Sequence, residues 1–265
     1  MGQGVWSAVG LVALLCAAAG VGVFINKHLP EHHRSRDSIE LVQLAITLLV
    51  TFVALVLGLL TNSVKSGYDA AYVARGAYAG ELAQLDRCLR DYGPETAKTR
   101  EQLRAYVAAV IASTWPDEPA PAGVKLPDVS DMPRTGENAK LADIINRVGL
   151  EIDGLQPEDT TRRNLAYACR LQFGDLMARR WQVIEGLRRS ISAPFYWVLV
   201  VWLVILFACF GLRAPPSRMS TIVIALSALS VSLAVFVILE MDSPYGGVFG
   251  IPSTTMRNAL ADMMR

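Results

Sequence analysis

The stretch LVQLAITLLVTFVALVLGLL, residues 41–60, decides the fold, because it is apolar along most of its length and carries no charged side chain. About 20 apolar residues in a helix are enough to cross the hydrocarbon core of a bilayer. A charge at the centre of such a helix would cost about 2.5–3.5 kcal/mol on insertion. Three further stretches, 5–25, 195–212 and 221–239, are similar in length and equally free of charge. The sequence therefore predicts an integral membrane protein with four transmembrane helices.

The composition separates into these apolar blocks and a polar remainder. Hydrophobic residues make up 52% of the 265 residues and charged residues 18%, nearly all of the latter between the blocks. The polar segment between the second and third blocks is too small to enclose four apolar helices, so a soluble protein with buried helices is excluded. The net charge is only +1, which provides no basic surface for nucleic acid. The lipid bilayer is the expected partner.

The segment between the second and third spans is predicted to be helical and to lie outside the bilayer. The second span has no helix breaker at its end, so its helix can continue to Tyr92, where Gly93 and Pro94 predict a turn into the next helix. A segment rich in Pro, Asp and Gly at 117–136 predicts a loop between further helices. The sequence contains no alternating strand pattern. The predicted fold class is all-α.

These boundaries divide the chain into four parts. Residues 1–61 hold the first two spans and a short basic loop, 62–192 an extramembrane helical domain, 193–240 the third and fourth spans, and 241–265 an interfacial C-terminal tail. In the tail, 254–264 has the pattern of a short amphipathic helix.

The short loops between the spans carry the charges that orient a membrane protein. Three basic residues lie at 26–40 and two at 213–220, and with four spans both loops share one face of the membrane. Short loops rich in Lys and Arg are normally cytoplasmic. We therefore expect the helical domain and both termini on the periplasmic or extracellular face of the cell (inner) membrane. The arginine-rich segment 179–189 and the resemblance described below favour the opposite orientation.

One side of the second span is polar or small. At helical spacing Gln43, Thr47, Thr51, Ala54 and Gly58 fall on one stripe, whereas the other sides carry Leu, Val, Ile and Phe. A glutamine amide facing lipid would have no hydrogen-bond partner, so the stripe is expected to meet protein or water. It is either a seam between helices or the lining of a pore shared by several copies. Partners available for a seam on the first and fourth spans are Ala13, Ala17, Ala18, Gly22, Ser227 and Ser230.

The turn at Gly93 predicts two antiparallel helices, in which residues equally distant from the turn face each other. Asp86 and Arg100, each seven residues from Gly93, then fall opposite each other as one candidate interhelical ion pair. Arg87, six residues before the turn, and Glu101, eight residues after it, are expected to form a second. Exposed pairs of this kind contribute about 0–1 kcal/mol each. They would therefore set the register of the two helices more than their stability.

Two of the four cysteines lie in the polar segment, and none forms a CxxC pair. Cys88 and Cys169 are each placed on a long helix that joins a membrane span, so antiparallel packing could bring them together. In an oxidising compartment they would then form a disulfide. The sequence leaves open whether their Cα atoms come within the roughly 4.4–6.8 Å that a disulfide requires.

Other groups that could bind a ligand or an ion are few. Glu240 and Asp242 follow the fourth span at the membrane edge, where they could cap the helix or form a cation-attracting ring in an oligomer. The three histidines lie together within 28–33, but Pro30 interrupts any helix there, so a polar interfacial loop is favoured over a metal site. The sequence contains no GxxxxGKS, GxSxG or HExxH motif. We therefore predict no catalytic residue, metal or cofactor, and no enzyme activity.

Several short motifs, in order along nearly the whole chain, resemble the bacterial bestrophin-like domain membrane proteins, a family classed as a domain of unknown function. The motifs are Leu29–His33, Asp37-Ser38, Ala54–Leu60, Leu85–Arg87, Tyr92–Glu95, Trp115-Pro116, Leu239–Pro244 and Arg257–Leu260. The resemblance implies an oligomeric membrane protein and, by analogy with bestrophins, an anion channel. It supplies no catalytic residues. The expected function is thus an oligomeric channel or pore for small ions, and the alternative is a non-conducting scaffold or signalling protein that acts through its extramembrane domain.

Overall fold

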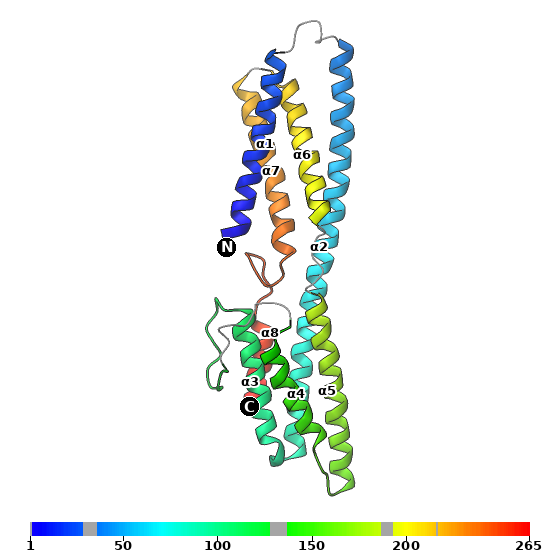
Figure 1. Cartoon of the computed structure of the whole chain (residues 1–265), viewed down its shortest axis with the longest axis vertical. Helices are drawn as coiled ribbons and strands as arrows, with labels where there is room; N and C mark the ends of the chain where they lie inside the picture. The colour runs from blue at the N-terminus through cyan, green and yellow to red at the C-terminus, as the bar shows by residue number, and fades with distance from the viewer. Residues whose placement is uncertain (1, 29–35, 128–136, 187–192, 216) are drawn as a thin grey trace. The chain divides into compact units, whose positions relative to one another are not determined.

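The structure is a computed structural model that describes residues 2–28, 36–127, 137–186, 193–215 and 217–265. All regular structure in this part of the chain is helical (Figure 1), which confirms the predicted all-α class. Four of the helices are long and apolar enough to cross a membrane. The helices are α1 (Gly2–His28), α2 (Arg36–Tyr92), α3 (Ala97–Thr114), α4 (Ala139–Asp153), α5 (Thr160–Gly186), α6 (Ala193–Arg213), α7 (Arg218–Met241) and α8 (Thr254–Met264), with a 3₁₀ turn η2 (Pro94–Thr96).

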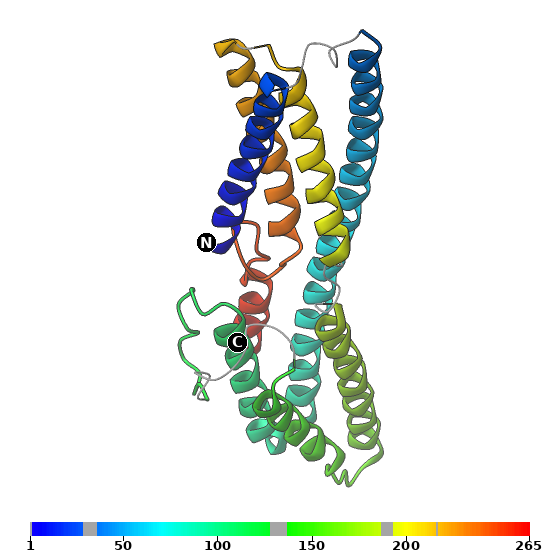
Figure 2. The same cartoon turned by 45° about the horizontal axis from the view of Figure 1, so that its top comes forward.

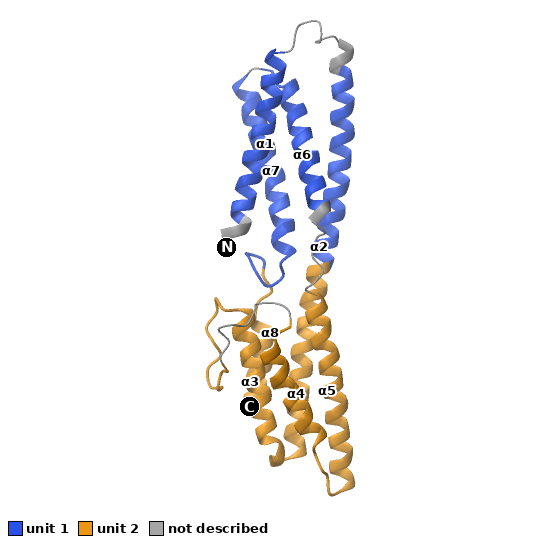
Figure 3. Cartoon of the chain, in the orientation of Figure 1, with its two compact units in different colours: residues 1–66, 190–249 blue, residues 67–189, 250–265 orange. Residues whose placement is uncertain are grey.

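The chain forms two compact units, coloured separately in Figure 3. Unit 1 comprises residues 1–66 and 190–249, and unit 2 comprises residues 67–189 and 250–265. Helix α2 belongs to both units, because it continues without interruption for 57 residues. At 1.5 Å per residue it is about 85 Å long, whereas a bilayer core is only about 30 Å thick. More than half of α2 therefore extends beyond any bilayer that its apolar part spans.

Unit 1 contains α1, α6, α7 and the first part of α2, and α1 packs against both α6 and α7 (Figure 2). The shared core consists of small and aliphatic residues with one phenylalanine, Phe207. Helix α2 contributes only Val53 to the fully buried set, with three neighbouring residues partly buried against it. The buried core residues are Leu11, Leu15, Ala18, Ala19, Val53, Leu199, Val200, Leu203, Phe207, Ala228 and Val235.

Two glycines allow α1 and α6 to approach closely. A Cβ atom on Gly22 would lie 2.0 Å from the carbonyl oxygen of Ala208, and one on Gly211 would lie 1.9 Å from that of Ala19. Both contacts are with backbone atoms, which cannot move aside as a flexible side chain could. Close packing of this kind holds membrane helices together where the hydrophobic effect offers little, since lipid is as apolar as the helices.

We expect Gly22→Ala to destabilise unit 1 by about 1–3 kcal/mol, because the added methyl group must push α6 away. Gly20→Ala is a matched control on the same helix, since a Cβ atom there meets nothing within 4 Å. The control should be neutral or stabilising by up to about 1 kcal/mol, because alanine favours helix more than glycine does. Thermal unfolding of the two variants in detergent measures the difference, and equal unfolding temperatures would show that α1 and α6 are not in this contact.

Unit 2 contains the turn that the sequence predicts at Gly93. Gly93 has φ 138°, a conformation that side chains rarely allow, and it ends α2. The Thr96 hydroxyl donates to the carbonyl oxygen of Leu89 and, at 2.8 Å, to the carbonyl oxygen of Gly93. These hydrogen bonds satisfy carbonyl groups at the end of α2. Helix α3 then follows, and the buried hydroxyl groups of Tyr78 on α2 and Tyr106 on α3 lie 2.6 Å apart.

Helix α4 is fixed by a cap at its start and a carboxylate near its end. The Asn138 side chain accepts a hydrogen bond from the backbone N–H of Leu141. Glu151 accepts hydrogen bonds from Thr99 (2.7 Å) and Gln102 (3.0 Å) on α3. Burial would raise the pKa of Glu151, but these hydrogen bonds and nearby Lys98 lower it below its ordinary value. The carboxylate therefore stays charged and ties α4 to α3.

The C-terminal tail, which the sequence predicts to be interfacial, packs within unit 2. Its amphipathic helix α8 packs against α3, and its apolar side chains Met256, Leu260 and Met263 are buried in unit 2. Just before α8, the carbonyl oxygen of Ile251 accepts a 2.7 Å hydrogen bond from the Trp115 indole. Arg257 on α8 pairs with Glu118 at 3.0 Å. The apolar face of α8 is thus covered by other residues of unit 2.

Candidate functional site

The polar stripe of the second span lies on the exposed side of α2. Gln43, Thr47, Thr51, Ala54 and Gly58 are all exposed to solvent in the isolated chain. The side that meets the rest of unit 1 is a different one, around Val53 and its partly buried neighbours. In its most apolar window, only 6% of the α2 span is buried inside the chain. This is the lowest buried fraction among the four candidate spans, so α2 presents most of its surface outward.

The polar atoms of the stripe are only partly satisfied by the chain itself. The Thr47 hydroxyl donates to the carbonyl oxygen of Gln43 at 3.0 Å, and the Thr51 hydroxyl donates to that of Thr47 at 2.9 Å. Each hydroxyl therefore bonds back to its own helix and keeps an acceptor site free. Gly58 faces open space, since a Cβ atom added there meets nothing within 4 Å. Of the groups on this stripe, the Gln43 amide has the most hydrogen-bond donors and acceptors.

The structure does not place the stripe against the helices that the seam interpretation names. Ala18 on α1 belongs to the core shared with α6 and α7, and Gly22 lies against Ala208 of α6. The hydroxyl of Ser227 on α7 bonds back to Val223 at 2.9 Å. Ala18 and Gly22 are thus packed inside unit 1, whereas Ala13 and Ala17 are exposed like the stripe itself. A seam that covers the stripe therefore needs another copy of the chain.

Of the two ion pairs expected across the Gly93 turn, the structure brings one together. Asp86, which is almost fully buried, accepts two 3.0 Å hydrogen bonds from the Arg100 guanidinium. Arg104, one turn further along α3, lies 3.7 Å from the same carboxylate. Sequence reasoning missed Arg104, although its spacing of four from Arg100 places it on the same helix face.

The second expected pair does not form within the described chain. Arg87 and Glu101 are both exposed, each on the outer side of its own helix. Each follows a residue of the Asp86–Arg100 pair, and a step of one residue rotates a side chain by roughly 100° around a helix. When Asp86 and Arg100 face each other in this way, their successors point elsewhere.

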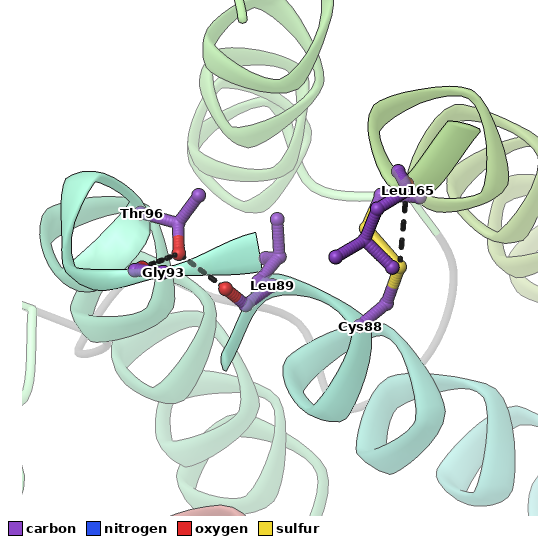
Figure 4. Close-up of a disulfide and its surroundings, with 6 residues drawn as sticks. Cys88, Leu89, Gly93, Thr96 and Leu165 are labelled. Atoms are coloured by element: carbon purple, nitrogen blue, oxygen red, sulfur yellow. Dashed lines mark hydrogen bonds between the residues drawn. A yellow bond between two sulfur atoms is a disulfide. The ribbon is translucent and has the colours of Figure 1, made fainter. Parts of the chain in front are cut away.

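The two cysteines of the polar segment are joined in a disulfide between α2 and α5 (Figure 4). The Cα atoms of Cys88 and Cys169 are 5.7 Å apart. The bond closes a loop with a sequence separation of 81, which contains α3 and α4. Cys16 and Cys209 are free thiols in the membrane helices α1 and α6.

Of the two acidic residues at the end of the fourth span, Glu240 binds the backbone of the segment that follows it. The Glu240 side chain accepts a 2.6 Å hydrogen bond from the backbone N–H of Val248. Gly247, with φ 71°, packs so closely on this carboxylate that a Cβ atom there would lie 1.8 Å from it. The backbone N–H of Asp242 donates to the carbonyl oxygen of Ile238 and ends α7. Within one chain, the Glu240 carboxylate therefore fixes the segment that follows α7.

Metal-binding groups do not cluster in the part of the chain that the structure describes. His28 lies at the end of α1, where its ring nitrogen Nδ1 lies 2.9 Å from the carbonyl oxygen of Phe24. The other two histidines lie outside the described residues.

Comparison with known proteins agrees with this fold. Two crystal structures of variants of a bacterial bestrophin homologue from Klebsiella pneumoniae are similar to it, with TM-scores of 0.66 and 0.65 at 15% and 16% sequence identity. The first match covers 97% of each chain, and the second covers 100% of this chain and 98% of the other. A third structure, described only as that of a membrane protein, matches with a TM-score of 0.61 at 17% identity over 97% of each chain. No curated protein matches the sequence.

The fold and the four apolar helices define a multi-pass, all-α membrane protein with a bestrophin-like fold. The bestrophin-like domain model matches residues 13–256, so the chain belongs to the bestrophin-like family. The resemblance that the sequence motifs indicate is confirmed.

Proposed function

We propose that several copies of this chain assemble in the membrane and that their α2 helices surround a pore for small ions. The observation that carries this proposal is the exposure of Gln43, Thr47, Thr51, Ala54 and Gly58 on the side of α2 that its own chain leaves uncovered. A glutamine amide within the hydrocarbon region must meet protein or water. Since the stripe meets neither α1 nor α7, other copies or a water-filled lumen must cover it.

The residue types on the stripe suit a water-filled lumen. The threonine hydroxyls and the Gln43 amide offer acceptors and donors to water or to a partly hydrated ion. Ala54 and Gly58 leave space beside the helix, because alanine has only a methyl side chain and glycine has no side chain. That bestrophins are oligomeric anion channels supports the same assignment for a family member, by analogy of fold.

The alternative is a non-conducting scaffold, in which the same stripe forms a closed seam between copies. Ala54 and Gly58 favour it, because small residues let membrane helices pack backbone to backbone. Its function would then reside in unit 2. The two candidates differ in one measurable property, which is ion flux through liposomes that contain the pure protein.

We expect the double variant Thr47→Leu, Thr51→Leu to reduce ion flux by about an order of magnitude or more, because an apolar constriction expels water from a pore. The matched control is Leu48→Ile, an exposed position that lies off the stripe on the neighbouring residue. The control should conduct like the unmodified chain. Equal flux in all three proteins would contradict the pore, and absence of flux from the unmodified chain would favour the scaffold.

We further propose that unit 2 and both termini face the periplasmic or extracellular side. The basic ends of the spans support this orientation: Lys27 lies in the last turn of α1, Arg213 ends α6 and Arg218 begins α7. A bond between Cys88 and Cys169 is also typical of an oxidising compartment.

A reporter that is active only in the cytoplasm tests this orientation when it is fused after Arg265. It should be silent, because the C-terminus lies outside. A strong signal would show that the C-terminus is cytoplasmic and would contradict this orientation. It would leave the proposal of a pore unchanged.

A further inference from the structure

The Cys88–Cys169 bond lies in the interior of unit 2. The exposed fraction of Cys88 is 6% and that of Cys169 is 0%. Around the bond, Leu85 and Leu89 on α2 and Ala166 on α5 are fully buried. Thiol–disulfide exchange requires a thiolate to attack a sulfur atom in line, so a sulfur atom must be accessible to the other reactant. In the finished fold, neither sulfur atom is accessible to another protein.

We propose that unit 2 is a substrate for oxidative folding: a partner protein that carries a reactive disulfide oxidises Cys88 and Cys169 before α5 packs against α2. This inference rests on the proposed orientation, which brings unit 2 into the compartment where disulfide donors act. The partner needs no site on the folded protein, because it acts on the chain while α5 is still separate. Once α5 has packed, the bond is closed to reductants as well.

The reaction balances without any further reactant. The thiolate of one cysteine attacks the disulfide of the donor, forms a mixed disulfide with it and releases one donor thiolate. The thiolate of the second cysteine then attacks the sulfur atom of the first, forms the Cys88–Cys169 bond and releases the other donor thiolate. The chain loses two protons and two electrons, and the donor is reduced from a disulfide to a dithiol.

The fold gives this reaction a single product. Cys88 and Cys169 are the only cysteines between the second and third spans, and the other two lie in apolar spans. The carbonyl oxygen of Leu165, one helical turn before Cys169, lies 3.8 Å from the Cys88 sulfur (Figure 4). The partner is therefore an oxidase, and no isomerase is needed to correct a wrong pairing.

Counting free thiols tests the proposal. The full chain is taken directly from cells into acid, unfolded, and reacted with a maleimide–polyethylene glycol that adds a fixed mass to each thiol. Of the four cysteines, two should react without prior reduction and all four after it. The control Cys16→Ser, Cys209→Ser, which keeps the bonded pair, should show no adduct before reduction and two after it. Four adducts without reduction would overturn the proposal.

The timing and the partner are tested in the same assay. A membrane-permeant dithiol added during synthesis should give four adducts, whereas the same reagent added after folding should leave two. In cells that lack disulfide-donor activity, four adducts are expected from the start. Full bond formation in those cells, or equal reduction before and after folding, would contradict the proposal. The reporter fused after Arg265 is independent of the thiol count, so a wrong orientation and a missing bond are distinguishable.

Discussion

The variant Cys88→Ser, Cys169→Ser is expected to unfold with a free energy about 4 kcal/mol lower than that of the oxidised chain. A cross-link lowers the entropy of the unfolded chain, and the effect grows with the length of the closed loop, here a sequence separation of 81. Denaturant unfolding of the full chain in detergent, followed by the signal of its tryptophans, measures the change. The loss should appear in unit 2, which contains both sulfur atoms.

The matched control for this experiment is Cys16→Ser, Cys209→Ser. These cysteines are free and partly buried in membrane helices, so their replacement leaves the cross-link intact. It should cost much less than the loss of the bond, since each change affects a single side chain. If both double variants unfold alike, the bond does not hold unit 2 together.

The variant Asp86→Ala is expected to destabilise unit 2 by about 3 kcal/mol, near the lower end for removal of one partner from a buried ion pair. The loss leaves two guanidinium groups without their carboxylate, and Arg100 keeps only 17% of its side chain exposed. The Arg104 side chain is 27% exposed, so water can solvate its charge more readily than that of Arg100. The loss of stability is therefore expected near the lower end of the range for buried ion pairs. The same unfolding experiment measures it.

Arg87→Ala is the control for Asp86→Ala, one residue further along the same helix. Arg87 is exposed and makes no ion pair with Glu101 in the described chain, so its loss should change the unfolding free energy by no more than about 0.5 kcal/mol. A cost for Arg87→Ala that equals the cost for Asp86→Ala would place Arg87 at the interface with α3, contrary to the structure.

The helices whose ends and apolar character depend only on nearby residues could be predicted from the sequence. The four apolar blocks correspond to α1, the first part of α2, α6 and α7, because length and absence of charge are sufficient to define a span. The continuation of α2 to Tyr92 and its end at Gly93 followed from the lack of any earlier breaker and from the freedom of glycine. Asn138 immediately precedes α4 and caps it, as its side chain allows.

The choice of partner for each helix face could not be predicted, because it depends on contacts distant in sequence. The small residues of α1 suited either α2 or α6, and the close contacts at Gly22 and Gly211 decide for α6. The apolar face of α8 suited a membrane surface as well as it suits α3. In the same way, the stripe on α2 was clear from helical spacing, but its exposure became clear only when the other helices were in place.

Cysteine accessibility on α2 tests the central claim most directly. In the Cys16→Ser, Cys209→Ser background, whose other two cysteines are bonded and buried, single cysteines are placed at Thr47, Thr51 and Leu48. The protein is reconstituted in liposomes and treated with a small, water-soluble, charged thiol reagent while ion flux is recorded. The pore predicts that cysteines at Thr47 and Thr51 react and that flux falls as they do, whereas the cysteine at Leu48 stays unmodified. If all three positions stay unreactive, or if Leu48 reacts as readily as Thr47, the stripe does not line a pore.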